Sequence, residues 1–376
     1  MKIAILGLGI VGGGVYKLAD EKTGLDVAAI LELRPHPELG DLIVKDFDAI
    51  LGDPEIEIVV ETMGGLHPAY EFVSAALKAG KHAVSSNKAL VAAYYNELTA
   101  LARENGVAFR CTAAVGGGIP WLTNLERICR LDKVERIHGI FNGTTNYVLD
   151  VMTREGRKFD EVLAEAQKLG YAEADPTADI DGWDIRRKIV ISSNIAYGVS
   201  ISEEDVAMAG IRYITAEDIA AFKEQGLTCK MIATSFPVEG GIAASVEPTL
   251  IAAGSPEAAV PNNYNRICVE SAALGPVAFF GQGAGRFPTA VNVVQDCIDI
   301  LAGCRNFYTD KAEPCSVCND SVERAYYVRS AVPGAFDDIA VGKMGGGVIT
   351  KPIAVSEMHR RAGAEDFFAA LPCGKD

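Results

Sequence analysis

The chain has 376 residues, which is more than one ordinary domain holds, so its length predicts two or three domains. A formal net charge of −15 disfavours nucleic-acid and membrane-surface partners and leaves small metabolites as the expected ligands. No apolar run approaches the ~18 residues of a membrane span, and Lys2–Leu6 leads into glycines without a cleavage site, so we expect a cytoplasmic protein.

From Met1 to about Cys111 the chain alternates short apolar runs with helical periodicity. This pattern is typical of the α/β class and indicates a Rossmann-type doubly wound parallel sheet with two mononucleotide-binding halves. The predicted strands are Lys2–Leu6, Asp26–Leu31, Ile56–Glu61, His82–Ser85 and Val107–Cys111. The predicted helices are Val11–Glu21, Pro68–Lys78 and Ala89–Glu104.

A glycine motif, Gly7-x-Gly9-x-x-Gly12, follows the first predicted strand and opens the first predicted helix. Its glycines permit a tight turn and a close approach to a pyrophosphate, which the helix dipole also favours. Glu32 lies 20 residues after Gly12, where a carboxylate would meet the adenosine ribose hydroxyls. The motif predicts a nicotinamide dinucleotide, although FAD or an adenosyl donor could use the same loop.

Two cations belong to this predicted site. Arg34 could clamp a 2′-phosphate, so NAD and NADP both stay open. Lys88 follows Asn87, a good N-cap, and therefore lies in the first turn of a helix, where the dipole disfavours a cation. Because it follows the fourth strand, at the sheet edge where such folds bind ligands, we interpret it as functional rather than as a solvated lysine.

Residues 116–284 mix clustered strands with separate helices, which indicates an α+β domain for catalysis and dimerisation. The predicted strands are Val134–Phe141, Ile242–Glu247, Tyr264–Ser271 and Pro276–Gly281. The predicted helices are Thr145–Glu155, Phe159–Leu169 and Gly182–Tyr197. A further helix, Thr289–Ala302, is expected to return to the first domain, which would then comprise residues 1–115 completed by 285–303.

Charged side chains gather between Gly170 and Lys188. Asp184 and Lys188 are four residues apart, so they share a helix face, and its apolar continuation should leave the lysine partly desolvated. A lysine oriented in this way by a carboxylate suits proton transfer to or from an alcohol. The five carboxylates from Glu173 to Asp184 could instead bind calcium, but their spacing does not match an EF-hand loop.

The segment Asn142-Gly143-Thr144-Thr145-Asn146 joins a predicted strand to a predicted helix. Its hydroxyl and N–H groups at a helix start would suit a substrate carboxylate. A pure capping role explains the same residues equally well.

The nine cysteines are odd in number and scattered, so we expect reduced thiols rather than a disulfide framework. Cys315-x-x-Cys318 has the spacing of metal ligands, but a zinc site needs about four of them. A loop with two free thiols is the simpler interpretation.

With these motifs in order, the chain resembles the homoserine dehydrogenases from about Met1 to Ala302. The resemblance rests on Gly7–Gly14, Gly80–Leu90, Gly117–Pro120, Asn142–Tyr147, Leu169–Thr177, and Gly281–Gly285 before Pro288–Ala290. It implies an NAD- or NADP-dependent enzyme that interconverts L-homoserine and L-aspartate 4-semialdehyde in threonine and methionine biosynthesis. It also implies a homodimer or higher homo-oligomer.

The resemblance further implies roles for individual residues. Lys188 would be the catalytic acid and base, together with Lys88 and Asp184. The dinucleotide would contact Leu8, Gly9, Ile10, Val11, Thr62, Lys88 and Gly285, in addition to Gly7, Gly12, Glu32 and Arg34. Glu173 would hold the amino-acid substrate with Asp184, and the predicted set is completed by Gly143, Thr144 and Tyr171.

The chain departs from the family pattern in two places. A sodium site would use the backbone carbonyls of Val115, Gly117 and Ile119, but a carboxylate common at the position of Thr112 is missing. Ala325–Arg329 resembles the opening of a regulatory ACT domain, yet only about fifty residues remain, fewer than the ~70 such a unit takes. We therefore expect residues 304–376 to be a truncated ACT-like extension, without support for threonine feedback.

Two alternative functions stay open. Trp183, beside the acidic segment, motivates reduction of a different amino-acid aldehyde. A non-catalytic nucleotide-sensing protein would also keep the glycine loop, but it would not need Glu173, Asp184 and Lys188 together.

Overall fold

The computed structural model describes residues 1–304 and 312–372 and divides into two compact units. The first unit comprises Met1–Leu131, Asn194–Ser200 and Gly281–Glu313, and the second comprises Asp132–Ser193, Ile201–Phe280 and Pro314–Asp376. None of the helices in the described residues combines the length and the apolar composition that crossing a bilayer requires.

The first unit is built on a six-stranded parallel sheet. Its strands are β1 (Lys2–Leu6), β2 (Asp26–Leu31), β3 (Ile43–Val44), β4 (Ile56–Glu61), β5 (His82–Ser85) and β6 (Phe109–Arg110). Its helices are α1 (Ile10–Leu18), α2 (Phe47–Leu51), α3 (Ala69–Lys78), α4 (Lys88–Glu104), α5 (Trp121–Cys129) and α11 (Arg286–Leu301), with 3₁₀ turns η1 (Pro37–Leu42) and η2 (Thr112–Ala114). The order β3-β2-β1-β4-β5-β6 is that of a doubly wound dinucleotide-binding sheet, so the predicted fold is confirmed.

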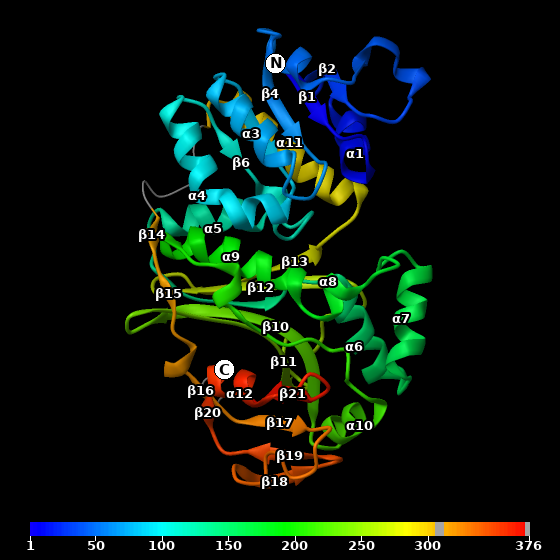
Figure 1. Cartoon of the computed structure of the whole chain (residues 1–376), viewed down its shortest axis with the longest axis vertical. Helices are drawn as coiled ribbons and strands as arrows, with labels where there is room; N and C mark the ends of the chain where they lie inside the picture. The colour runs from blue at the N-terminus through cyan, green and yellow to red at the C-terminus, as the bar shows by residue number, and fades with distance from the viewer. Residues whose placement is uncertain (305–311, 373–376) are drawn as a thin grey trace. The chain divides into compact units, whose positions relative to one another are not determined.

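Helix α11 completes the first unit from far along the chain. Its residues Ala290 and Val293 share one apolar cluster with Ile3 of β1. A Cβ built on Gly14 of α1 would lie 2.8 Å from the Cβ of Ala290, so only glycine permits the close approach of the two helices. Figure 1 shows α11, coloured yellow, beside the blue α1. The predicted returning helix is confirmed, and it begins at Arg286 rather than at Thr289.

The second unit is built on a mixed sheet of eleven strands within the described residues. These are β7 (Val134–Ile140), β9 (Ala207–Met208), β10 (Leu227–Val238), β11 (Gly241–Ala252), β12 (Tyr264–Ser271), β13 (Gly275–Gln282), β15 (Ser316–Val317), β17 (Tyr326–Arg329), β18 (Ala340–Met344), β19 (Gly347–Thr350) and β21 (Phe367–Ala370). Its main path is β13-β12-β7-β10-β11-β21-β17-β19-β18. A separate short pair in this unit is formed by β16 (Glu323–Arg324) with β20 (Ile353–Ala354). Another short pair joins β14 (Glu313–Pro314) to β8 (Val199–Ser200), and β8 and Glu313 belong to the first unit.

Helices accompany this sheet, as an α+β domain requires. They are α6 (Gly143–Glu155), α7 (Phe159–Lys168), α8 (Thr177–Ile180), α9 (Trp183–Tyr197), α10 (Ala216–Glu224) and α12 (Val355–Arg361), with 3₁₀ turns η3 (Glu203–Asp205) and η4 (Asn319–Ser321). The predicted helices correspond to α6, α7 and α9, and their bounds shift by no more than two residues.

Strand β10 is a long element that the sequence pattern did not predict. It pairs antiparallel with both β11 and β7. Four consecutive residues, Thr228, Cys229, Lys230 and Met231, are buried, so side chains on both faces of the strand are covered. Such a strand lacks the alternation of apolar and polar residues that identifies a half-buried strand.

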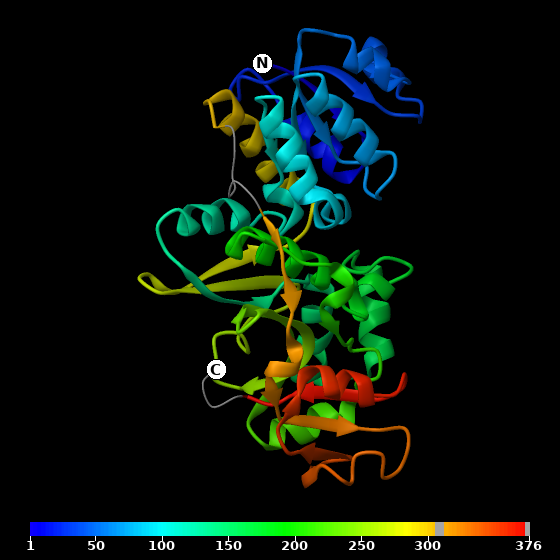
Figure 2. The same ribbon diagram turned by 60° about the vertical axis from the view of Figure 1, so that its left-hand side comes forward.

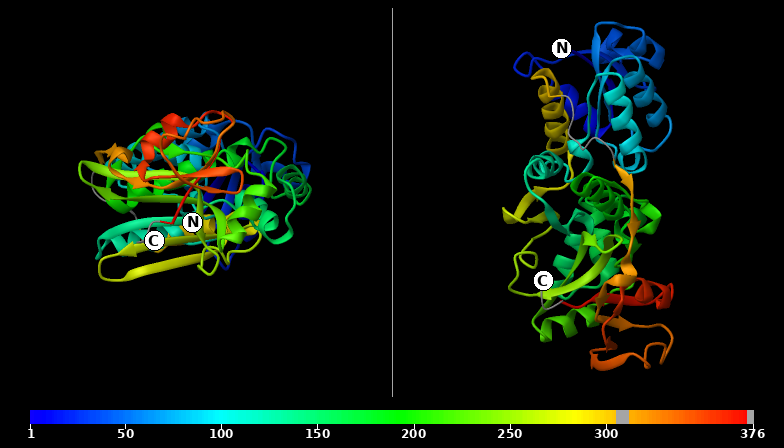
Figure 3. Two further views of the ribbon diagram at one scale, coloured as in Figure 1. Left: turned by 90° about the horizontal axis from the view of Figure 1, so that it is seen from below. Right: turned by 90° about the vertical axis from the view of Figure 1, so that its left-hand side faces the viewer.

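The C-terminal segment continues the sheet of the second unit. Strand β21 pairs with β11 at Thr249 and Ala370, and β17 lies between β21 and β19. The orange and red elements of Figure 2 and Figure 3 belong to this segment. Residues 305–311 and 373–376 of the predicted extension lie outside the described residues, and its identity as a truncated ACT-like segment stays a prediction.

Two buried carboxylates hold β17 and the preceding β16 in place. The carboxylate of Glu247 on β11 is almost fully buried and accepts hydrogen bonds from Arg324 Nη1 at 2.7 Å and Tyr326 Oη at 3.1 Å. Asp218 on α10 is also buried and accepts one from Tyr327 Oη at 2.5 Å. The C-terminal segment therefore supplies the polar partners of two carboxylates in the body of the unit.

Candidate active site

The predicted glycine loop connects β1 to α1, and its backbone takes the conformation that the motif requires. Gly7 has a φ of +88°, and a Cβ on Gly12 would lie 2.0 Å from the carbonyl oxygen of Gly7. Thr62 Oγ1, just after β4, donates to that same oxygen at 2.8 Å. A Cβ on Gly9, the N-cap of α1, would meet no heavy atom within 4 Å, so the loop leaves open space at the helix start. This cradle fits the pyrophosphate of a dinucleotide.

Glu32 follows β2 and is tied to the glycine loop. Its side chain is only 8% exposed, and Oε2 accepts a hydrogen bond from the backbone N–H of Leu8 at 3.1 Å. Arg34 donates to the same carboxylate, through Nη2 to Oε2 at 2.7 Å and through Nε to Oε1 at 3.1 Å. These bonds from Arg34 lower the pKa of Glu32 to about 2, against the opposing effect of burial. The carboxylate is thus ionised and rigidly placed.

Lys88 begins α4, three residues beyond the end of β5. Asn87 is its N-cap, because the Asn87 side chain accepts a hydrogen bond from the N–H of Leu90 at 3.2 Å. The predicted position of Lys88 in the first turn of this helix is confirmed, and the structure shows the residue half-buried. Its role at the dinucleotide stays a prediction.

Glu61 is a buried residue at the carboxyl end of β4 that the sequence analysis did not single out. Its carboxylate accepts hydrogen bonds from Ser85 Oγ at 2.6 Å, from the N–H of Met63 at 2.8 Å and from Asn87 Nδ2 at 3.4 Å. Burial raises the pKa of Glu61, and these donors oppose that rise. Glu61 joins the loops after β4 and β5, and an acid directly after the apolar run of residues 58–60 was the available signal.

The predicted sodium ligands lie in a glycine-rich turn of the first unit. Asn292 of α11 donates its side-chain N–H groups to the carbonyls of Gly117 at 2.6 Å and Ile119 at 3.1 Å. Gly285 is the N-cap of the same helix and has a φ of +125°. Two of the three proposed carbonyls therefore already accept hydrogen bonds, and sodium binding at Val115, Gly117 and Ile119 stays a prediction.

In the second unit, Lys188 and Asp184 form a buried ion pair on α9. Lys188 Nζ lies 2.7 Å from Asp184 Oδ2 and donates to the carbonyl oxygen of Phe141 at 2.7 Å. Both side chains are buried, as are Ile191 and Ile195 farther along the helix. The predicted shared face with an apolar continuation is confirmed. An ammonium group in this setting has a fixed position rather than the freedom of a surface lysine.

Asn142 connects this ion pair to a second carboxylate that the sequence analysis did not single out. Its Nδ2 donates to Asp184 Oδ2 at 2.8 Å and to Asp179 Oδ1 at 2.7 Å. Thr144 Oγ1 lies 3.1 Å from Asp179 Oδ2 and donates to the carbonyl of Tyr171 at 2.5 Å. Asn142 also caps α6 by accepting from the N–H of Thr145 at 2.9 Å. The capping and functional interpretations of this segment are therefore compatible.

The remaining predicted substrate residues lie around this network. A Cβ on Gly143 would lie 2.6 Å from the carbonyl oxygen of Asn263, which explains the glycine. Glu173 is exposed, and its backbone carbonyl accepts a hydrogen bond from Gln167 Nε2 at 3.1 Å. Tyr171 is 38% exposed, with its ring 5.1 Å from that of Tyr147. Their contact with substrate stays a prediction.

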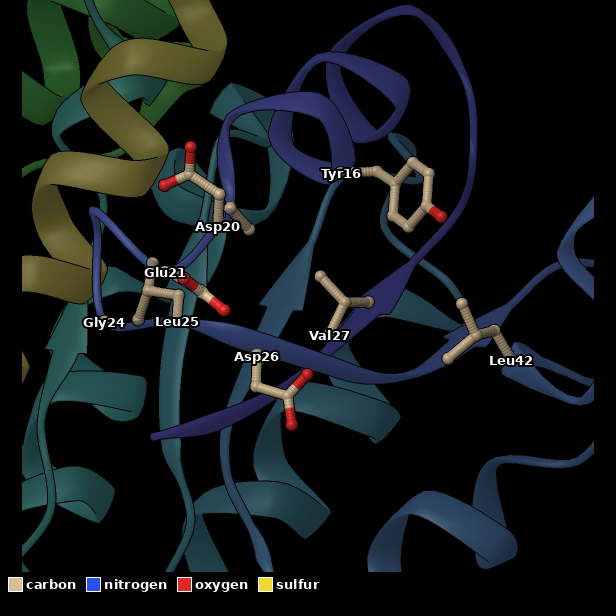
Figure 4. A pocket seen from close by; sticks show the side chains of 9 residues that line it. Tyr16, Asp20, Glu21, Gly24, Leu25, Asp26, Val27 and Leu42 are labelled. Carbon is tan, nitrogen blue, oxygen red and sulfur yellow. The ribbon is translucent and has the colours of Figure 1, made fainter.

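A hollow in the first unit lies away from the glycine loop. It adjoins the amino end of β2, where Asp26 begins the strand, whereas Glu32 follows the carboxyl end. Parallel sheets of this kind bind ligands at the carboxyl ends of their strands, so the hollow is not the dinucleotide site. Figure 4 shows its lining, formed by Tyr16, Ala19, Asp20, Glu21, Gly24, Leu25, Asp26, Val27 and Leu42.

The described residues contain no cluster of three or more His, Cys, Asp or Glu side chains that could hold a metal ion. The described part of the chain therefore adds no third ligand to Cys315 and Cys318. No disulfide joins the cysteines of that part either.

The chain is similar in sequence and in structure to known proteins. Models of the homoserine dehydrogenase NAD-binding domain and of homoserine dehydrogenase match residues 7–112 and 120–298. A homoserine dehydrogenase of Synechocystis is 42% identical over 320 residues, which is 80% of this chain and 73% of that protein. The crystal structure of a homoserine dehydrogenase from Thiobacillus denitrificans matches with a TM-score of 0.85 and 32% identity, over 99% of this chain and 98% of that one. A hyperthermophilic archaeal homoserine dehydrogenase in complex with NADPH matches with a TM-score of 0.69 and 27% identity, over 80% and 98% of the chains.

Proposed function

Because the chain belongs to the homoserine dehydrogenase family, we propose that it interconverts L-homoserine and L-aspartate 4-semialdehyde with NAD or NADP. The single observation that carries the mechanism is the buried ion pair of Lys188 and Asp184, which also contacts Phe141 and Asn142. The alternatives, another amino-acid aldehyde as substrate or a non-catalytic nucleotide sensor, are not favoured by relatives that are named homoserine dehydrogenases.

The first unit would hold the dinucleotide. The glycine loop would receive the pyrophosphate, Glu32 the adenosine ribose, and Thr62, Lys88 and Gly285 would line the rest of the cofactor. A bound nicotinamide supplies the hydride acceptor or donor of the reaction. The open space at Gly9 and the tight contacts at Gly12 support this assignment.

Lys188 would move the proton of the reacting oxygen. During oxidation of the alcohol it removes the hydroxyl proton, and during reduction of the aldehyde it returns one, so no free alkoxide forms. Asp184 and the carbonyl of Phe141 hold its Nζ at 2.7 Å each, which fixes the direction of transfer. Asp184, Asp179 and Glu173 would attract the ammonium group of the amino-acid substrate, and Thr144, Gly143 and Tyr171 would shape its site.

The test is the oxidation of L-homoserine, followed by absorbance of the reduced cofactor. Lys188→Met should lower kcat at least 100-fold, the lower range for general acid–base catalysis, without changing dinucleotide binding. Lys168→Met is the matched control, because that lysine is exposed at the end of α7. Full turnover by Lys188→Met would refute the role of this lysine, and no turnover by the unaltered protein with either cofactor would refute the function.

A panel of amino-acid aldehydes tests the specificity. L-aspartate 4-semialdehyde should have the highest kcat/KM. Preference for a bulkier aldehyde would instead support the alternative motivated by Trp183, whose ring is partly exposed and lies 4.2 Å from the Arg186 guanidinium carbon.

We also propose a homodimer that works in the cytoplasm in threonine and methionine biosynthesis. Strand β13 is an edge of its sheet, and Phe280 on that strand is 57% exposed. Unpaired edges with apolar side chains are suited to association. Light scattering should give twice the chain mass of 39.9 kDa, and a monomer would contradict the proposal.

A further inference from the structure

We infer that Glu32 and its ion pair with Arg34 make this chain select NAD over NADP. The inference rests on the proposed function, since it names which of the two dinucleotides the first unit takes. The two cofactors differ by a phosphate on the adenosine ribose, and the residue after β2 is the one that meets this ribose in doubly wound folds.

The position of Glu32 is fixed from two sides. The backbone N–H of Leu8 in the glycine loop donates to Oε2 at 3.1 Å, and the backbone N–H of Arg34 donates to Oε1 at 2.9 Å. The side chain is only 8% exposed, so neighbouring atoms leave it little room to move aside for a larger group. Displacing it would also release the glycine loop that it holds.

The charge of Glu32 favours hydroxyl groups over phosphate. Its pKa is lowered to about 2, chiefly by the bonds from Arg34, so the carboxylate is ionised throughout the physiological range. An ionised carboxylate only accepts hydrogen bonds, and a 2′- or 3′-hydroxyl of NAD can replace one of the N–H donors from Leu8 and Arg34 that already reach Glu32. The 2′-phosphate of NADP carries negative charge and no such donor at neutral pH, so it would be repelled.

The neighbouring cations already have acceptors. Arg34 binds both oxygens of Glu32, through Nε at 3.1 Å and Nη2 at 2.7 Å. Lys45 Nζ donates to the carbonyls of Glu32, Leu33 and Arg34 at 2.7, 2.9 and 3.1 Å, which uses all three of its donors. To bind a phosphate, either cation would have to give up these bonds beside an ionised carboxylate.

Calorimetric titration of the full chain with NAD⁺ and NADP⁺, in the absence of substrate, tests the inference without relying on turnover. The unaltered protein should bind NAD⁺ at least tenfold more tightly than NADP⁺, about 1.4 kcal/mol. Glu32→Gln, which keeps the shape and removes the charge, should bring the two dissociation constants within about threefold. Glu38→Gln is the matched control, because that carboxylate is exposed in the same segment, and it should leave the ratio unchanged.

Arg34→Gln separates the two interpretations of the arginine. If Arg34 serves Glu32, this variant keeps the preference for NAD⁺. Equal or tighter NADP⁺ binding by the unaltered protein, with selective loss of NADP⁺ binding in Arg34→Gln, would overturn the inference. Far-ultraviolet circular dichroism checks that each variant is folded, and the ratio in the unaltered protein decides even if one is not. Tight NAD⁺ binding without oxidation of L-homoserine would overturn the proposed function alone.

Discussion

At the scale of single residues, the second unit contains a charged side chain that is completely buried. Lys230 on β10 is fully buried, and its Nζ donates to Asn146 Oδ1 and to the carbonyl of Val260, each at 2.8 Å. Asn146 follows the Asn142-Gly143-Thr144-Thr145 segment on α6, so this lysine supports the helix that carries part of the candidate active site. Burial lowers the pKa of Lys230 to about 8.

This shift predicts how stability depends on pH. Between pH 8 and the ordinary value of 10.5 the unfolded state holds more protons on Lys230, so the free energy of unfolding rises with pH through this window. The contribution is complete above pH 10.5 and is lost as pH falls through about 8. Lys230→Met should therefore cost roughly 2 kcal/mol more stability at pH 10 than at pH 7.

Urea unfolding at the two pH values measures this difference. Lys223→Met is the control, because that lysine is exposed on the neighbouring helix α10. A cost of Lys230→Met that does not change with pH would show that the buried ammonium has no perturbed proton affinity.

Residue-scale prediction from the sequence succeeded where the determining contact is local. Asp184 and Lys188 are one helical turn apart, so their spacing alone placed them on one face. Asp179 and Glu61 were missed because their partners are distant in sequence: Asn142 lies 37 residues before Asp179, and Ser85 lies 24 residues after Glu61. No local pattern identifies a carboxylate whose role is set by the tertiary fold.

At the scale of elements, β16 and β17 join the C-terminal segment to the body of the second unit through two similar pairs of arginine and tyrosine contacts to a buried carboxylate. Arg324 and Tyr326 contact Glu247, and Tyr327 and Arg329 contact Asp218. His359 of α12 adds a third partner to Glu247, with Nε2 2.8 Å from Oε1. The segment is therefore held by buried polar contacts as well as by strand pairing.

Removing one partner should reveal the strength of this attachment. Arg324→Leu leaves the carboxylate of Glu247, which is 1% exposed, without its cation and should cost about 3 kcal/mol of unfolding free energy. Arg360→Leu removes an exposed ion pair with Glu357 and should have no measurable effect. Equal unfolding midpoints in urea for the two variants would contradict the prediction.

The prediction of strands likewise succeeded where the signal is local in sequence and failed where it depends on tertiary contacts. Strands β1, β2, β4 and β5 were predicted to the residue, because buried parallel strands form continuous apolar runs between glycine and helix signals. Strand β6 is shorter than the predicted Val107–Cys111, and β10 was missed because Lys230 interrupts its apolar run. The burial of that lysine depends on Asn146, which a strand pattern does not contain.

At the scale of the whole molecule, the first unit is assembled from both ends of a long stretch of chain. Helix α11 packs on α1 and supplies Ala290, Val293 and Cys297 to the apolar cluster around β1. Most of the chain between α5 and α11 belongs to the second unit, which continues after α11 from Pro314. The glycine loop thus depends on residues near position 290.

Gly14→Ala tests this dependence. Its new methyl group would meet the Cβ of Ala290 at 2.8 Å and the carbonyl of Arg286 at 2.9 Å, so overpacking should cost about 1–3 kcal/mol and weaken NAD⁺ binding. Adding Ala290→Gly should recover part of both losses, because it removes one of the two clashes. Thermal unfolding and NAD⁺ titration measure the effects, and additive losses in the double variant would refute direct packing.

The late position of α11 also has a consequence for synthesis on the ribosome. Helix α1 ends at Leu18, and its partner α11 begins at Arg286. The first unit therefore lacks α11 until the intervening chain has been translated. At elongation rates of about 5–20 residues per second this delay is roughly 10–60 s. During that interval the apolar side of β1 is open to chaperones.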